Sequence, residues 1–237
     1  MKAIVLSFLL VALPTGEVRA QSSESDSRPV LTVSGSAQVR VTPDLATVRL
    51  GVVQQATTAG SAQDDVNGVA GRMLDAFGAA GVQERHIQTS RLTLTPIYSR
   101  QRPGETDPRI IAYRAANTVT VRVEDLDLLG AVIDAGLGAG ANQLQGVTFG
   151  LMDDLPARES ALAEAIGEAR RKAQVMAEAL GVRLLAVLSV SEGGVSIQRP
   201  MMEGRMMAMQ EAVATPVSAG EMTVSANVSI RYTIAPN

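Results

Sequence analysis

The chain has 237 residues, 46% of them hydrophobic, and a formal net charge of −3. This size and composition suit one or two globular domains. The absence of cysteine excludes a disulfide framework and lipid attachment at a processed cysteine.

The first twenty residues have the layout of a secretory signal peptide. Met1-Lys2 is a short charged start, residues 3–13 are apolar, and a proline and a glycine follow. Small and medium apolar residues at the usual positions predict cleavage after Ala20. About eleven apolar residues are too few to cross a bilayer, which needs about 20, so a membrane anchor is excluded. No other segment is long and apolar enough to span a membrane.

Removal of residues 1–20 leaves 19 basic and 23 acidic residues, a net charge of −4. That balance offers no electrostatic footprint for nucleic acid or anionic lipid. The polar residues 21–29 lack periodicity and predict a flexible mature N-terminus. The sequence therefore predicts an exported soluble protein with one domain at residues 30–235.

The domain begins with two strand patterns. Every second residue is small or apolar from Leu31 to Val41 and again from Ala46 to Val52, with a turn expected at residues 42–44. We expect these two strands to face the same way. Residues 60–80 then change to helical periodicity, and Gly81 suits the position just after a helix end.

The middle of the domain predicts a hairpin and a short helix. Strands are expected at Ile87–Tyr98 and in a segment that ends at Val123, joined by an exposed loop at residues 99–108. Asp125 can cap a short helix, which residues 136–140 end.

The longest helix is predicted after a strand near Leu144–Met152. Asp153 or Asp154 is the expected cap, Pro156 suits the first turn and Gly181 ends the helix. An inner stripe is expected to face a sheet, with alanines that allow close approach: Leu162, Ala165, Ile166, Ala169, Ala173, Met176, Ala177 and Leu180.

Two further strands and one long insert complete the domain. Strands are predicted at Leu184–Val190 and at Met222–Ile234, where apolar and polar residues alternate. Between them, residues 193–220 form a methionine-rich loop. Paired strands with one polar face and three intervening helices indicate an α+β fold, with a mainly antiparallel sheet of about six to eight strands in two-layer packing.

The order of these segments resembles the SIMPL-domain family over residues 31–234. The resemblance rests on short motifs in a fixed order: Val33-Ser34-Gly35, Pro43-Asp44, Ile87-Gln88-Thr89, Pro96-Ile97-Tyr98, residues 112–117, Asp125-Leu126-Asp127, Gly140-Ala141-Asn142, Gly146-Val147-Thr148-Phe149, residues 165–181 and Gly220-Glu221. It implies a periplasmic protein, a link to oxidative-stress defence and assembly into large ring-like homo-oligomers. No catalytic residue is established for the family.

Most chemical candidates have a simpler explanation. His86 is the only histidine, too few for a zinc site, and no GxSxG elbow accompanies it. Lys172 is the only lysine after signal cleavage, and Glu168 one turn earlier suggests an ordinary helix ion pair.

Paired carboxylates and one glycine-rich segment are also explained locally. Asp64-Asp65, Asp125 with Asp127, and Asp153-Asp154 lie near predicted helix starts, where negative charge is favoured. Residues 136–140 lack the GxxxxGK[ST] pattern of a phosphate loop and follow a helix. We therefore expect no catalytic constellation, no cofactor and no metal site built from these residues.

The methionine cluster keeps three interpretations open. Five of the nine residues from 201 to 209 are methionine: Met201, Met202, Met206, Met207 and Met209. They can pack against the body or a neighbouring subunit, act as a sink for oxidants, or bind Cu(I) through the Met207 and Met209 thioethers. The sequence thus predicts a non-enzymatic periplasmic protein in stress defence, with a scaffolding oligomer as the alternative.

Overall fold

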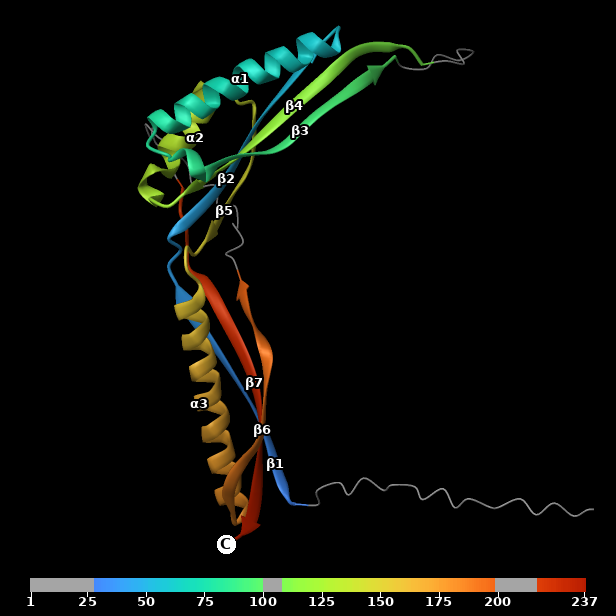
Figure 1. The fold of residues 1–237 in the computed structure, drawn as a ribbon. Helices are drawn as coiled ribbons and strands as arrows, with labels where there is room; N and C mark the ends of the chain where they lie inside the picture. The colour runs from blue at the N-terminus through green and yellow to red at the C-terminus, as the bar shows by residue number, and fades with distance from the viewer. Residues whose placement is uncertain (1–27, 100–107, 199–216) are drawn as a thin grey trace, which may run out of the picture.

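The computed structural model describes residues 28–99, 108–198 and 217–237, and Figure 1 shows its seven strands in two antiparallel sheets. One sheet has the order β1-β7-β6 and the other β3-β4-β2-β5. The strands are β1 (Val30–Val41), β2 (Leu45–Ala56), β3 (Ile87–Tyr98), β4 (Ile110–Val123), β5 (Gln143–Gly150), β6 (Val182–Gln198) and β7 (Met222–Pro236). The expected α+β class with antiparallel strands and three helices is confirmed.

One difference concerns the first turn. β1 and β2 were expected to face the same way in one sheet, but they belong to different sheets, so residues 42–44 cross from one sheet to the other. The backbone N–H of Asp44 donates to the Gly150 carbonyl at 3.2 Å, and the Asp44 carboxylate accepts from the Met152 N–H at 2.7 Å. Asp44 thereby links the connection between β1 and β2 to the connection between β5 and the helix that follows it.

The four-stranded sheet is covered on one face by α1 (Ala59–Ala79) and α2 (Leu129–Gly138), as Figure 1 shows. Thr58 caps α1 by accepting the Ser61 N–H at 3.1 Å. The core between helices and sheet contains large side chains that are fully or almost fully buried: Leu50, Met73, Phe77, Leu129 and Ile133. Asp125 does cap a helix, but that helix is a short 3-10 turn, η2 (Leu126–Leu128), which leads into α2.

The three-stranded sheet is covered by α3 (Leu155–Leu180), which begins after Asp154 with proline in its first turn and ends at Gly181 with φ +66°. The expected inner stripe was only partly right. Leu162 packs partly buried against this core, but Ile166, Met176 and Leu180 are exposed. The residues of the helix that are buried against the sheet are all alanines: Ala157, Ala161, Ala165, Ala169, Ala173 and Ala177.

β6 is longer than the sequence predicts. It continues to Gln198, so the first residues of the expected insert at 193–220 belong to the strand. Gln198 pairs with Thr223, so the end of β6 lies beside the start of β7. Val217 and Ala219, just before β7, pack against the core of the four-stranded sheet.

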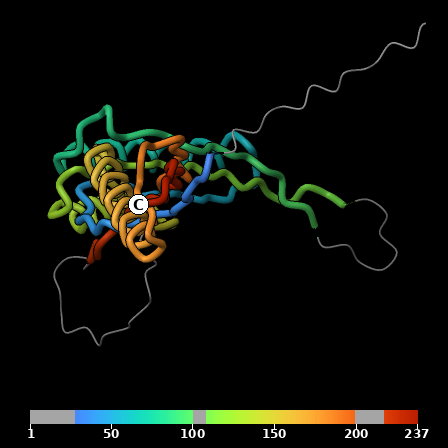
Figure 2. Tube along the Cα trace, turned by 90° about the horizontal axis from the view of Figure 1, so that it is seen from below, coloured from blue at the N-terminus to red at the C-terminus, as the bar shows by residue number. Residues whose placement is uncertain are grey.

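The hairpin of β3 and β4 projects beyond the helices, which is clearest in Figure 2. The Ser99 N–H donates to the Arg109 carbonyl at 2.7 Å, so the two strands pair up to the connection between them. Residues 100–107 of the expected loop lie outside the described residues, as do the predicted signal peptide at 1–20 and the polar residues 21–27.

Candidate functional site

The methionine cluster that the sequence singles out lies outside the described residues. Met201, Met202, Met206, Met207 and Met209 all fall within residues 199–216. Four other methionines are described. Met73, in the core of the four-stranded sheet, and Met222 are buried, whereas Met152 and Met176 are exposed. The described part of the chain therefore supplies both buried and exposed reference thioethers.

His86 lies directly before β3, between two charged side chains. Its Nε2 atom is 3.0 Å from Arg85 Nε, which can donate to it, and 3.3 Å from a carboxylate oxygen of Glu124. One imidazole nitrogen cannot both accept from Arg85 and donate to Glu124, so the two contacts are alternatives. Neither partner is a nucleophile, and the arrangement is a surface contact between η1 (Glu84–His86) and the end of β4.

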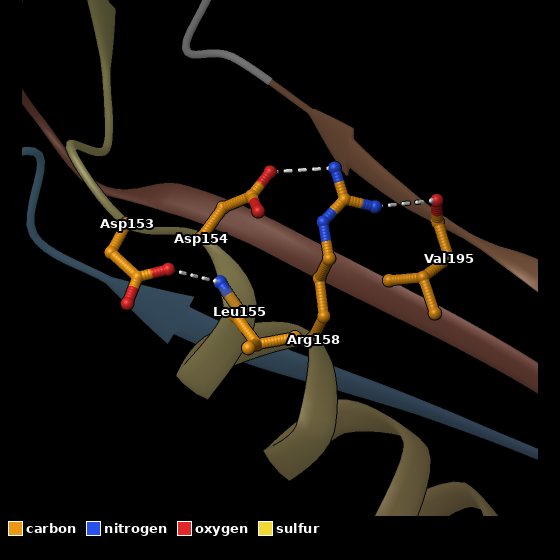
Figure 3. Close-up of polar contacts among 5 residues, drawn as sticks. All are labelled: Asp153, Asp154, Leu155, Arg158 and Val195. Atoms are coloured by element: carbon orange, nitrogen blue, oxygen red, sulfur yellow. Dashed lines mark hydrogen bonds and ion pairs between the residues drawn. The ribbon is translucent and has the colours of Figure 1, made fainter.

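The carboxylate pairs have different structural roles. Asp64 and Asp65 are exposed in the second turn of α1, and the cap there is Thr58. Asp153 and Asp154 flank the start of α3 (Figure 3): the Leu155 N–H donates to Asp153 at 3.0 Å, and Arg158 Nη2 lies 2.6 Å from Asp154. The hydrogen bond from Arg158 is the main reason that the pKa of Asp154 is lowered.

Arg158 also connects α3 to β6. Its Nη1 donates to the Val195 carbonyl at 3.4 Å, as Figure 3 shows. The Asp154 hydrogen bond is the main cause that raises the pKa of Arg158. These contacts anchor the first turn of the helix to the strand, and they explain the acidic pair without any reaction.

A closer contact joins the middle of α3 to the free edge of β1. A Cβ atom on Gly35 would lie 2.0 Å from the Ala165 carbonyl oxygen and 2.6 Å from the Ala169 nitrogen. Only glycine on the strand and alanine on the helix allow this approach. The backbones of α3 and β1 are therefore nearly in contact at this point.

Glu168 and Lys172 occupy the edge of β1 that β7 leaves unpaired; we name this contact the edge clamp. The Ser36 N–H donates to Glu168 Oε2 at 2.5 Å, and Lys172 Nζ donates to the Ser34 carbonyl at 3.2 Å. The two side chains also pair with each other at 3.0 Å. The expected ion pair is confirmed, and its second role on β1 was missed because spacing along a helix carries no information about a strand 132 residues away.

Electrostatics reinforce the edge clamp. The Ser36 backbone N–H, followed by the Lys172 ammonium, holds the pKa of Glu168 below its usual range. A groove of about 570 Å³ runs beside it, lined by Ser34, Glu168, Lys172 and Met176 among others. Because Glu168 and Lys172 are already bonded to each other and to backbone, neither is a free acid, base or nucleophile in this groove. The clamp covers backbone groups that would otherwise pair with another strand.

Large apolar side chains are exposed on two other surfaces. On the β3–β4 hairpin they are Leu92, Leu94, Tyr98, Ile110 and Ile111. On β6 they are Leu185, Val187, Leu188 and Val190, beside a groove of about 470 Å³ between this strand and α3. Apolar surface of this extent is typical of protein contacts.

Within residues 28–99, 108–198 and 217–237, no three His, Cys, Asp or Glu side chains gather as metal ligands would. The helices of this same part of the chain include none with the length and apolar character that a bilayer crossing requires.

Comparison with known proteins agrees with this order of elements. The sequence profile of SIMPL, described as a protein of unknown function (DUF541), matches residues 31–232. The chain belongs to the SIMPL family. The resemblance drawn from the sequence motifs is confirmed.

Several SIMPL-family relatives match along most of their length. The 26 kDa periplasmic immunogenic protein of Brucella melitensis is 31% identical over 91% of this chain and 89% of its own. The uncharacterized protein YggE of Edwardsiella ictaluri is 31% identical over 88% of this chain and 86% of its own, and that of Escherichia coli is 30% identical over 85% and 79%. These relatives carry no enzyme name. An amidase from Burkholderia phymatum aligns with 60% of the chain at 16% identity, and its TM-score of 0.25 is too low to relate the two folds.

Proposed function

We propose that this SIMPL-family protein acts in the periplasm as a non-enzymatic homo-oligomer that contributes to defence against oxidants. The export-like first twenty residues and the periplasmic name of the Brucella relative support the compartment. The observation that carries the self-association is the exposed apolar surface of the β3–β4 hairpin and of β6. Contact with other copies would remove this surface from water.

Self-association is tested first. Multi-angle light scattering on the mature protein, residues 21–237, should give a mass that is a multiple of the chain mass at micromolar concentration. A monomer under these conditions would end the homo-oligomer proposal.

The role against oxidants rests on the methionine cluster, because thioethers are the abundant oxidisable groups in a chain without cysteine. Peptide mass spectrometry after mild peroxide should show sulfoxide at Met201–Met209 at least as early as at exposed Met152 and Met176. Buried Met73 and Met222 serve as the slow reference. If the cluster oxidises no faster than Met73, a role of the cluster as a sink for oxidants is excluded.

The scaffolding alternative assigns the cluster to subunit or partner contacts instead. Deletion of residues 201–209 separates the two functions. Lost assembly with unchanged peroxide survival of cells supports the scaffold, whereas intact assembly with lost survival supports the sink. Titration of the mature protein with Cu(I) tests the third interpretation, and equal affinity in the deletion variant would exclude copper binding by the cluster.

A further inference from the structure

We define the hairpin arm as residues 91–98 of β3 together with residues 109–114, which are Arg109 and the first residues of β4. It continues the helix-covered face of its sheet beyond the helices. Leu94 is paired with buried Ala115, and Pro96 with Tyr113. Cross-strand partners lie on one face, so Leu94 and Pro96 share the face that α1 covers nearer the core. On the arm, where no helix covers this face, Leu94 is 43% exposed. A two-stranded ribbon with bare apolar side chains is marginally stable by itself in water.

The arm and the strands that carry it are basic. Residues 87–99 and 108–123 contain four arginines and no acidic residue: Arg91, Arg109, Arg114 and Arg122. All four are exposed. Residues 100–107 add two arginines and two acidic residues, which leaves the balance of the hairpin unchanged. This local charge contrasts with the net −4 of the mature chain.

The opposite end of the same unit is acidic; we define this helical end as residues 74–86 and 124–138. The two segments adjoin, since His86 contacts Glu124 at 3.3 Å and a Cβ on Gly81 would lie 3.7 Å from Leu128. The helical end contains six acidic residues and one arginine: Asp75, Glu84, Glu124, Asp125, Asp127, Asp134 and Arg85. Exposed leucines lie among them: Leu74, Leu128 and Leu137.

We infer that the hairpin arm of one copy binds the helical end of another copy, an inference that rests on the proposed self-association. Both surfaces combine exposed apolar side chains with charge of opposite sign, which steers and selects a partner. The other apolar surface, along α3 and β6, is a poorer match for a basic arm, because residues 155–180 carry four acidic and four basic residues. The arm and the helical end lie at opposite ends of the four-stranded unit in Figure 1, so an arm cannot reach its own helical end.

A contact between two different surfaces propagates from copy to copy. It closes into a ring if the rotation between neighbours closes, and otherwise forms a filament. The inferred contact is therefore heterologous, and that property provides a sharp test.

The test uses two charge-reversal variants of the mature protein. The arm variant is Arg91→Glu with Arg114→Glu, which changes the charge of the arm from +3 to −1. The end variant is Asp75→Lys with Glu84→Lys and Asp127→Lys, which changes the charge of the helical end from −5 to +1. Each alone should need an about 100-fold higher concentration to assemble, because like charges then face each other. An equimolar mixture should recover wild-type assembly, since every reversed arm finds a reversed end and every native arm a native end.

The matched control is Arg183→Glu with Arg231→Glu, which makes the same charge change on exposed positions of the three-stranded sheet. It should assemble as wild type does, and far-ultraviolet circular dichroism should show all variants folded. A monomeric wild-type protein would overturn self-association itself. If wild type is oligomeric and the arm variant assembles equally well, only the inferred contact is overturned. The same holds if the equimolar mixture fails to recover assembly. An arm variant that assembles normally but loses adsorption to anionic phospholipid vesicles would assign the arm to a membrane surface instead.

Discussion

The two sheets of this protein are covered by their helices in opposite ways. α1 and α2 bury large side chains such as Phe77 and Leu50 against the four-stranded sheet. α3 buries only alanines against the three-stranded sheet, with Gly35 opposite its middle. One interface is filled by side-chain volume, and the other is stabilised by close approach of backbones.

The difference decides which substitutions each interface tolerates. A volume-filled core is damaged when atoms are removed, because a cavity remains. A close-approach interface is damaged when atoms are added, because no space is left for them. Substitutions at the two interfaces test this contrast.

Phe77→Ala should lower the free energy of unfolding of the four-stranded unit by about 3–5 kcal/mol, because the phenyl ring is fully buried among Leu50 and the α2 residues. Urea unfolding followed by hydrogen exchange will measure the loss and locate it. Leu74→Ala on the exposed side of the same helix is the control. A loss at Leu74 as large as that at Phe77 would contradict a core filled by volume.

Gly35→Ala should lower the stability of the three-stranded unit by about 3 kcal/mol, since the new methyl group would overlap backbone atoms of α3. The same urea experiment measures it. The two nearest atoms are the Ala165 carbonyl oxygen and the Ala169 nitrogen, so adding Ala169→Gly should not restore stability. Full rescue by this second change would show that side chains, and not backbones, set the distance.

Glu168→Gln should remove stability in a way that depends on pH. Because the Ser36 N–H and Lys172 lower the pKa of Glu168 in the folded protein, its ionised form stabilises the fold. That contribution is complete above the ordinary pKa of a glutamate and is lost as the pH falls through the lowered pKa. Wild type and variant should therefore differ in urea midpoint at neutral pH and converge in acid.

Glu164→Gln, one turn earlier on the exposed side of α3, is the matched control for the edge clamp. Its urea midpoint should follow that of wild type across the same pH range. If the urea midpoints of wild type and Glu168→Gln differ by the same amount from neutral to strongly acidic pH, the ionised carboxylate is excluded as the cause of the stabilisation.

Much of the fold was predictable because local patterns are strong. The alternation at Met222–Ile234 and the helical spacing at residues 60–80 correspond to β7 and α1 within one or two residues. The division into two sheets was not predictable, since the turn at residues 42–44 has the same local chemistry whether it closes a hairpin or crosses between sheets. The orientation of α3 was also missed, because larger apolar residues such as Ile166 were assumed to face the sheet.

The candidate contacts divide in the same way. The Glu168–Lys172 pair was predictable from its spacing of four residues, but its bonds to Ser34 and Ser36 depend on tertiary placement. The basic hairpin and the acidic helical end are visible as charge runs, yet their position at opposite ends of one unit requires the fold. A signal was available in the sequence: no acidic residue occurs among residues 108–123, whereas four occur in residues 124–138.

Gly167→Ala should raise the stability of the three-stranded unit by about 0.5–1 kcal/mol, the opposite sign to the same change at Gly35. Gly167 lies in the interior of α3, and its nearest neighbour to a new Cβ would be the flexible Arg171 side chain at 3.6 Å. Alanine is therefore accommodated there, and it restricts the unfolded chain. The urea midpoint measures the gain at low protein concentration. A loss of stability that appears only when the protein assembles would show that another copy approaches this side of α3 as closely as β1 approaches the other.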